Sequence, residues 1–395
     1  MKKTRSYWVP DYYPEFVCKC GQCRSTCCEG WDVSLSMEEY FRLVGMECSP
    51  ELRGKMDGAF HIVENPTPER YAQISHNWQG DCPLRLPNGY CRLQCECGED
   101  ALSSVCRYYP RSPRTVFDSE CACSNSCEGV LELLFGRKEP MTFLQQELTF
   151  DLPERNSKAP QRLIRHYHEI RRRSIGEIQN RDLPFPMRLM RLGQILRTLD
   201  QAFRTRDDAQ ILQSMEYCRG YVLPDPGCGD AVSALNFLMR INEVLGMNSA
   251  SVCDYARQCA QRLSGDAVER PAQYARAAAE FDRLFPDWPV FFEQMLVNHM
   301  FYESFPFSDR RENLWDEFLS LCAVWAYVRF LAVCATDGHS EEAHLVDICA
   351  AAFRLIDHSA FDWNALTLWN AEFSSDRGRV GEDEARNTLI ALCRM

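Results

Sequence analysis

Cysteine is the residue type of this chain whose number and spacing point most directly to chemistry. The sequence holds 22 cysteines, and fourteen of them lie between Cys18 and Cys127. The other eight, from Cys218 to Cys393, stand singly in helical patterns, where a free cysteine is usually a small buried apolar residue. We therefore expect a cysteine-ligated metal centre within residues 18 to 127.

Three kinds of chemistry could explain such crowding. Disulfides need an oxidising compartment, and the start, MKKTRSYWVPDYYPEF, has the basic end of a signal peptide without its apolar middle. Structural zinc favours two separated Cys-x2-Cys pairs, and only Cys20 and Cys23 have that spacing. Iron–sulfur clusters accept more varied spacings, because the inorganic core spreads its ligand positions over several iron atoms. Of these three explanations, an iron–sulfur cluster is favoured and zinc is the main alternative.

Adjacent Cys27 and Cys28 are awkward co-ligands of one metal, because successive side chains tend to point apart. One of them could bind while its neighbour packs or serves another centre. The two histidines of this region, His61 and His76, read as surface or core residues rather than ligands.

Composition limits the class of protein and its partners. With 395 residues, of which 46% are apolar, the chain can form one large or two ordinary domains. A formal charge of −12 argues against nucleic acid as a partner and favours lysine-rich partners. No run of 18 or more apolar residues occurs. We expect a cytoplasmic protein that contacts no membrane.

The patterns along the chain predict a mainly α protein with three segments. Residues 1–135 should form a loop-rich, cysteine-rich metal-binding domain. It contains a capping box, Ser36 with Glu39, before a helix that stops at Gly45, and a small β-hairpin from residues 60–64 and 71–76. Residues 136–186 are a Pro- and Arg-rich connection. Residues 187–395 should be an all-α domain, with apolar residues at helical intervals over 187–203 and further helices near 208–219, 231–245, 250–264, 271–284, 289–303, 311–335, 341–357 and 382–393.

Other motifs have plain structural explanations. The sequence VLPDPGCGD, residues 222–230, is similar to a cofactor-binding turn, but helical patterns on both sides favour a helix–helix turn. The cluster Arg162, Arg165, Arg171, Arg172 and Arg173 fits a solvated helix face better than an anion site. Tyr109 and Arg111 are candidates for binding a cofactor, although anchoring of the loop after Cys106 to the core explains them better.

Several of these motifs resemble the flagellin lysine N-methylase family. The resemblance opens with Phe16, Cys18, Cys23, Cys27, Cys28, Gly30 and Trp31 and continues with Gly80, Cys82, Pro83, Leu86, Gly89 and Cys91. It includes Gly98, Glu99, Leu102, Ser103, Cys106, Tyr109, Pro110, Arg111 and Cys127, and later Asn298, Phe305, Pro306 and Phe307. Six further cysteines, Cys20, Cys48, Cys95, Cys97, Cys121 and Cys123, lie outside the pattern.

The resemblance implies an enzyme that transfers methyl groups from S-adenosylmethionine to lysine ε-amino groups of flagellin. It also implies a [4Fe–4S] cluster in the N-terminal region, whose candidate ligands are Cys18, Cys23, Cys27, Cys28, Cys82, Cys91, Cys106 and Cys127. A structural role ranks first for the cluster, ahead of cofactor binding and electron supply. The sequence does not identify the catalytic base. The alternative is a non-enzymatic iron–sulfur or zinc module with a helical domain that binds a partner.

Overall fold

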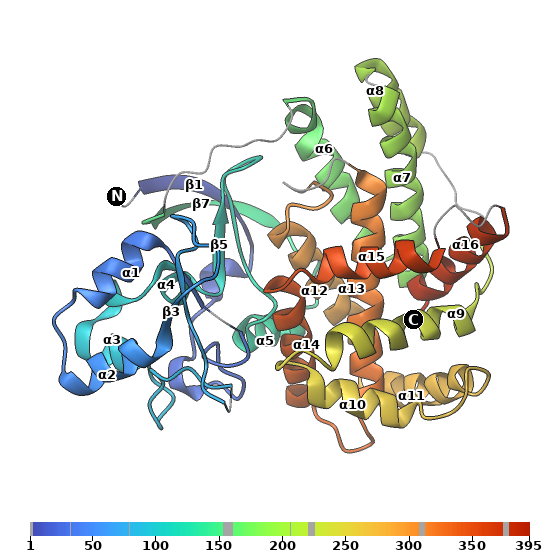
Figure 1. The fold of residues 1–395 in the computed structure, drawn as a ribbon. Coiled ribbons are helices and arrows are strands. Elements are labelled where there is room, and N and C mark those ends of the chain that lie inside the picture. The colour runs from blue at the N-terminus through green and yellow to red at the C-terminus, as the bar shows by residue number, and fades with distance from the viewer. Residues whose placement is uncertain are drawn as a thin grey trace.

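The computed structural model describes residues 3–31, 33–78, 80–152, 161–205, 207–219, 226–307, 313–373 and 379–395. Figure 1 shows a smaller part that contains the strands and a larger part built of helices, with the two in contact along one side. This arrangement confirms the predicted fold class, a small sheet region at the N-terminus followed by an all-helical domain.

A four-stranded sheet joins the beginning of the chain to the helical part. Its strands are β1 (Lys3–Pro10), β5 (Arg111–Arg114), β6 (Glu120–Cys123) and β7 (Phe143–Phe150), in the order β5-β6-β1-β7. β1 runs antiparallel to β7, with Lys3 opposite Phe150 and Pro10 opposite Phe143. α5 (Glu128–Gly136) follows β6 and packs against the helical part. The sequence patterns did not predict this sheet.

A second, smaller unit has its own core. Its strands, β2 (Val33–Leu35), β3 (Phe60–Ile62) and β4 (Ala72–Ile74), form a sheet in the order β2-β4-β3. The β3–β4 pair confirms the predicted hairpin, and the predicted capping box begins α1 (Met37–Val44). The other helices are α2 (Pro50–Ala59), α3 (Arg92–Cys97) and α4 (Ser104–Tyr108). Thirteen buried apolar residues between positions 33 and 102 fill this small core.

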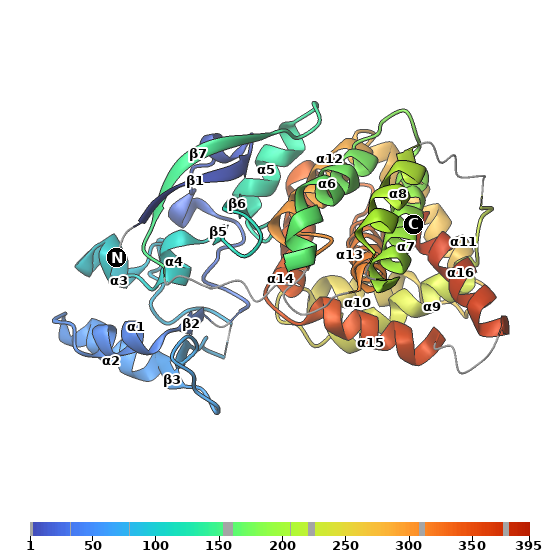
Figure 2. The same cartoon turned by 90° about the horizontal axis from the view of Figure 1, so that it is seen from above.

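The larger part consists of helices packed around α13 (Leu314–Ala335). The others are α6 (Gln161–Ile178), α7 (Phe185–Thr205), α8 (Asp208–Arg219), α9 (Ala231–Ile241), α10 (Cys253–Arg262), α11 (Arg270–Leu284), α12 (Trp288–Tyr302), α14 (Glu342–Asp357), α15 (Phe361–Phe373) and α16 (Arg379–Cys393). α13 has the length and apolar composition of a membrane-spanning helix, but its apolar stretch is entirely buried inside this part. Such burial is what a central helix of a bundle requires. Figure 2 shows α6 and α12 on the side of this part that faces the sheet.

The helical part also contains two segments for which the sequence made a prediction, the turn within residues 222–230 and the connection over residues 136–186. Gly227 and Gly229, both with positive φ, lie in the turn before α9, whose N-cap is Asp230; Asp225 lies outside the described residues. β7 and all of α6 fall within residues 136–186, so the predicted connection contributes a sheet strand and a bundle helix.

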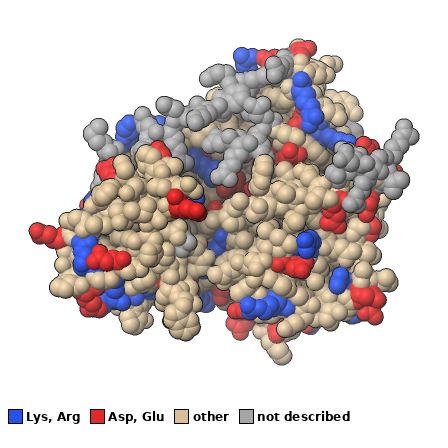
Figure 3. Space-filling model, in the orientation of Figure 1, with Lys and Arg blue, Asp and Glu red and all other residues tan. Residues whose placement is uncertain are grey.

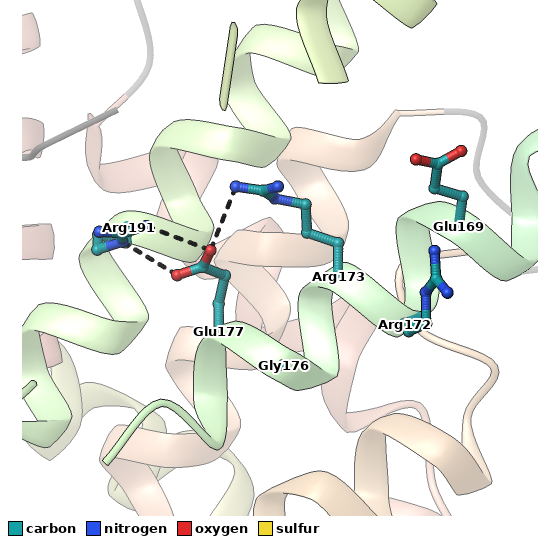
Figure 4. Close-up of a pocket in the computed structure, with 6 residues that line it drawn as sticks. All are labelled: Glu169, Arg172, Arg173, Gly176, Glu177 and Arg191. Atoms are coloured by element: carbon teal, nitrogen blue, oxygen red, sulfur yellow. Dashed lines mark hydrogen bonds and ion pairs between the residues drawn. The ribbon is translucent and has the colours of Figure 1, made fainter. Parts of the chain in front are cut away.

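The arginine cluster of α6 has several different environments. Arg171 is buried and forms an ion pair with Glu120 of β6. Arg172 and Arg173 line a hollow of about 410 Å³, in which Glu177 accepts a hydrogen bond from Arg191 Nε at 3.0 Å (Figure 4). The side chain of Arg162 lies outside the described residues. The carboxylates in the hollow offset part of its positive charge.

Candidate functional site

Four of the predicted metal ligands gather on the small unit: Cys28, Cys82, Cys91 and Cys106. The backbone of Cys82 donates a hydrogen bond to the carbonyl oxygen of Cys28 at 2.8 Å. A turn then brings Arg85 opposite Cys91, which precedes the first residue of α3. Cys106 lies in the first turn of α4, where its backbone N–H is bonded to Ser103 Oγ at 3.2 Å.

The thiols of this group are close enough to influence one another electrostatically. A hydrogen bond from the Cys27 thiol lowers the pKa of Cys28 to about 7, against the opposing effect of burial. Burial raises the pKa of Cys82 and of Cys106 to about 12, and the negative charge of Cys28 adds to both shifts. The pKa of Cys91 rises for the same two reasons. Cys28 is thus the residue whose charge acts on all three other thiols of the group.

A second group contains Cys18, Cys23 and Cys127 and lies at the start of α5. Burial raises the pKa of Cys127 to about 11 and that of Cys23 to about 12, and the charge of Cys18 contributes to both shifts. The residue after Cys127 is Glu128, whose side chain is completely buried. Its carboxylate accepts hydrogen bonds from Lys19 Nζ at 2.6 Å and from the backbone of Ser25 at 2.7 Å. Glu128 therefore holds the loop of the first cysteines against α5.

Cys27 lies between the two groups. Its pKa is raised first by the hydrogen bond with Cys28 and then by burial, and the charges of Cys106 and Cys127 contribute as well. The carbonyl oxygen of Cys27 accepts a hydrogen bond from Trp31 Nε1 at 3.1 Å. Among the residues that the structure describes, no three Cys, His, Asp or Glu side chains are already placed to hold a metal ion. The thiols are neighbours, but they are not arranged as a finished coordination sphere.

The six cysteines outside the family pattern have other environments. Cys121 and Cys123 are fully buried in β6, and Cys121 donates a hydrogen bond from its thiol to Tyr13 Oη at 3.4 Å. Cys48 and Cys97 pack against the small core. Cys20 and Cys95 are exposed beside Cys18 and Cys91. Of the eight C-terminal cysteines, five are buried, as expected for apolar packing, and Cys218 lies outside the described side chains.

A hydrogen-bonded network connects this region to the helical part. Tyr109 Oη lies 3.0 Å from Ser126 Oγ, and Ser126 Oγ lies 2.9 Å from His358 Nε2. Ser126 also bonds to Ser124, which donates to Asp357 Oδ2 at 2.5 Å. The ring of His358 stacks on Trp31, with centroids 4.2 Å apart and an interplanar angle of 13°. The network therefore contains residues of both parts of the molecule.

Charged residues continue the network from Asp357. His299 Nδ1 of α12 lies 3.3 Å from Asp357 Oδ1, and both side chains are almost fully buried. Burial alone would lower the pKa of His299, but the carboxylate of Asp357 outweighs it and leaves that pKa raised. Arg114 of β5 forms an ion pair with Glu303 at 3.2 Å. His358 differs, because burial lowers its pKa.

We call the region where this network connects the two parts of the molecule the junction. Several of its side chains are partly exposed to solvent although protein atoms surround them closely. Tyr109, Tyr302 and His358 keep intermediate exposure, yet burial is the main cause of the shift in the pKa of each. Nearby, Ser25, Tyr255 and Asp347 line a hollow of about 370 Å³.

Comparison with known proteins gives the identity of the helical part. A family model described as the FliB lysine N-methylase C-terminal domain matches residues 171–368, half of the chain. The chain belongs to the FliB lysine N-methylase family. The match covers only the C-terminal domain, and neither the curated proteins nor the solved structures contain a match to the chain.

The matched lysine N-methylase domain supplies one side of the junction. His299, Asp357 and His358 all lie within residues 171–368, whereas Tyr109, Ser126 and Trp31 precede it. Sequence reasoning did not single out these three matched residues. The available signal was weak, an Asp–His pair at the end of the helical pattern over 341–357.

The structure also positions the other motif residues of this lysine N-methylase. Tyr109 belongs to the network, whereas the Arg111 guanidinium lies over the ring of Phe16 at 4.9 Å, just before the first cysteine. Asn298 is fully buried; it accepts a hydrogen bond from Tyr12 Oη at 2.7 Å and donates one to the carbonyl oxygen of Cys123 at 2.8 Å. Asn298 thereby fixes α12 to β6, and cofactor binding by Tyr109 and Arg111 stays a prediction.

Proposed function

We propose that this protein is a protein-lysine N-methyltransferase that transfers methyl groups from S-adenosylmethionine to lysine ε-amino groups of flagellin. The observation that carries the proposal is the match of residues 171–368 to the FliB lysine N-methylase domain. The junction described above is the proposed methyl-transfer site, because it joins residues of the matched domain to the cysteine region.

Two aromatic rings at the junction suit a cationic substrate. Trp31 and Tyr109 offer π-faces to a cation, whereas the carboxylates of Asp357 and Glu303 are already paired with His299 and Arg114. Interspersed acidic and basic residues on the face shown in Figure 3 leave no large area of a single sign. Recognition of the lysine then depends on local groups at the junction rather than on a long-range field.

Methyl transfer requires a neutral amine aligned with the methyl donor. When bound, S-adenosylmethionine supplies an electrophilic methyl group on a sulfonium sulfur. The lysine nitrogen would form the new C–N bond as the C–S bond of the donor breaks, and the positive charge would pass from sulfur to nitrogen. In this proposal His358, whose imidazole burial favours in the neutral form, accepts the proton that the ammonium must lose first.

The serine hydroxyls extend this proton path. Ser126 Oγ lies between His358 and Ser124, and Ser124 is bonded to Asp357. A hydroxyl can accept one proton while donating another, so the two serines connect the imidazole to a carboxylate. In this proposal His358 is the base, and Ser124, Ser126 and Asp357 position it.

We further propose that the N-terminal cysteines hold a [4Fe–4S] cluster. The donor set supports it, because the eight candidate ligands are all soft thiol groups on the N-terminal loops. When bound, the cluster would tie the loops around Cys28 and Cys127 to the junction. A colourless protein that carries zinc instead would contradict this part of the proposal.

The test is a methylation assay with protein purified without oxygen. Incubation with S-adenosylmethionine and unmethylated flagellin should raise the flagellin mass in steps of one methyl group. His358→Gln, which keeps a polar side chain but no base, should lower the rate by about 10²–10⁴-fold, the usual contribution of a general base. No gain in flagellin mass with intact, metal-loaded protein would contradict the function itself.

A matched variant separates loss of the base from general disturbance. His344→Gln makes the same change on α14, more than three helical turns before His358, where the imidazole is bonded to Ser340 instead. Its methylation rate should equal that of the wild type. Equal losses in the two variants would rule out a specific role for His358.

A further inference from the structure

The hollow formed by α6 and α7 carries more positive than negative charge, although the chain as a whole is acidic. It has a volume of about 410 Å³ and is lined by Glu169, Arg172, Arg173, Gly176, Glu177 and Arg191. Three arginines against two carboxylates give it a formal charge of +1, whereas the complete chain carries −12. The residues that line the hollow differ from those of the junction, so the proposed methyl transfer does not use them.

The arginines of the hollow come from two helices. Arg172 and Arg173 lie on α6, and Arg191 lies on α7. Along the sequence, the arginines of α6 form a run that a solvated helix face explains. The packing of α6 against α7 adds a third guanidinium from another direction (Figure 4). Guanidinium groups that line one hollow from two helices suit a ligand with negatively charged oxygens.

Glu177 orients two of these guanidinium groups. Its side chain is buried, and its carboxylate accepts hydrogen bonds from Arg191 Nε at 3.0 Å and from Arg173 Nη2 at 3.4 Å. A second bond from Arg191, through Nη2 at 3.4 Å, completes a fork on the same carboxylate. The Nη1 group of Arg191 bonds to no residue that the structure describes, so its donors remain available to a ligand.

Arg172 is the second source of available donors. Its side chain is exposed, and within the described ranges it has neither a hydrogen-bond partner nor an ion-pair partner. In Figure 4, Arg172 and Glu169 lie at the end of the hollow away from Arg191. A guanidinium in this state can form two parallel hydrogen bonds with an oxyanion without breaking an existing ion pair.

Gly176 keeps the hollow open. It lies inside α6, where glycine weakens a helix relative to alanine. A Cβ at this position would have no atom within 4 Å, so close packing does not require the glycine. What Gly176 contributes is open space beside the arginines.

We propose that this hollow binds the phosphate group of a small molecule. The oxygens of a phosphate point in four directions, which suits N–H donors that come from two helices, whereas a planar carboxylate matches a single guanidinium fork. A nucleic acid does not fit, because a chain with a charge of −12 repels a polyanion. The inference is independent of the proposed methyl transfer.

Isothermal titration calorimetry of the full chain at low ionic strength tests the proposal, with inorganic phosphate, adenosine monophosphate and acetate as ligands. Both phosphate compounds should bind, and acetate should bind at least about tenfold more weakly. Tighter binding of adenosine monophosphate would identify a phosphate ester as the ligand, and equal binding would identify free phosphate. Acetate that binds as well as phosphate, or no binding of either phosphate at millimolar concentration, would overturn the proposal.

Three variants of the hollow should change the affinity in different directions. Arg172→Gln should weaken phosphate binding at least about tenfold, because a hydrogen bond from a charged donor is lost. Glu169→Gln should strengthen it about twofold to fivefold, because a negative charge at the edge of the hollow is removed. Gly176→Leu should abolish binding by filling the hollow, while far-UV circular dichroism shows unchanged helices.

The control is Arg276→Gln, which makes the same change at an exposed arginine of α11, outside the hollow. Its affinity for phosphate should equal that of the wild type. Equal losses in the Arg172 and Arg276 variants would overturn the proposal, because phosphate would then respond to the surface charge in general. Undiminished binding by a folded Gly176→Leu variant would overturn it as well.

Discussion

At the scale of single residues, Asp357 joins the two parts of the molecule through one carboxylate. Its Oδ2 accepts a hydrogen bond from Ser124, and its Oδ1 lies 3.3 Å from His299 Nδ1. The raised pKa of His299 means that the folded protein holds this proton more tightly than the unfolded chain. The resulting stabilisation is complete below the unfolded pKa of histidine, about 6.5, and is lost as the pH rises through the folded pKa.

Asp357→Asn should therefore destabilise the protein more at low pH than at high pH. We expect a loss of about 1–3 kcal/mol in the free energy of unfolding at about pH 5.5 and a smaller loss at about pH 8.5. Burial lowers the pKa of His358, and the charge of Asp357 opposes that effect. The loss of Asp357 should therefore also destabilise the protein at low pH through His358. Urea denaturation at both pH values measures the effect.

The control for this prediction is Asp287→Asn, which makes the same change in an exposed ion pair with Lys138. Its effect should stay within about 0.5 kcal/mol at both pH values. A loss for Asp357→Asn that does not depend on pH would show that His299 gains nothing from the carboxylate.

Glu128 determines the position of the first cysteine loop. Burial alone would raise the pKa of Glu128, but the hydrogen bonds from Lys19, Ser25 and Arg24 outweigh it and leave the pKa lowered. A lowered pKa stabilises the fold above the unfolded value, about 4.3, and this stabilisation is lost as the pH falls through the folded pKa. At neutral pH the carboxylate therefore contributes fully.

Glu128→Gln should loosen residues 18–25 at neutral pH, because an uncharged amide binds the Lys19 ammonium less strongly. Hydrogen exchange followed by mass spectrometry should show about tenfold faster exchange in this loop, equivalent to about 1.4 kcal/mol. Glu132→Gln is the control, since its side chain is partly exposed and also contacts Lys19. Equal exchange in the two variants would contradict the role of Glu128.

At the scale of elements, the sequence predicts helices far better than the sheet. The expected helices over 271–284 and 341–357 correspond closely to α11 and α14, because their apolar residues recur at helical intervals. α15 was missed because apolar residues such as Trp363 on its exposed face obscure the single buried face, formed by Phe361, Ala365, Leu366, Trp369 and Phe373. β1 and β7 were missed because β1 lacks regular alternation and its partner lies about 140 residues away.

The contact between α7 and α13 gives a prediction at this scale. Gly193 of α7 lies against Phe318, and a Cβ at that glycine would be 2.4 Å from the ring. Gly193→Ala should lower the free energy of unfolding by about 1–3 kcal/mol through overpacking. Gly176→Ala on α6 should raise it by about 0.4–1 kcal/mol, because no atom lies within 4 Å of the added Cβ and alanine favours the helix. Chemical denaturation should therefore give opposite signs for the two variants.

At the scale of the whole molecule, the sequence indicates which residues could bind metal but not how they group. The resemblance to the methylase family selected eight cysteines, and Cys28 and Cys82 meet through a backbone contact between distant loops. The junction depends on still longer separations, such as Trp31 on His358. Contacts of this kind follow from the tertiary fold, which no local pattern encodes.

Removal of metal should affect the two parts unequally. The small unit has a core of thirteen buried apolar residues, whereas the helical part contains long buried helices such as α13. Small cores rarely suffice alone, and metal-binding free energy contributes directly to their folding. A chelator under reducing conditions should therefore speed hydrogen exchange in residues 18–31 and 82–106 by at least about tenfold, with α13 unchanged. Loss of protection in α13 as well would mean that the proposed cluster stabilises the entire fold, and unchanged exchange in both regions would mean that the small unit needs no metal.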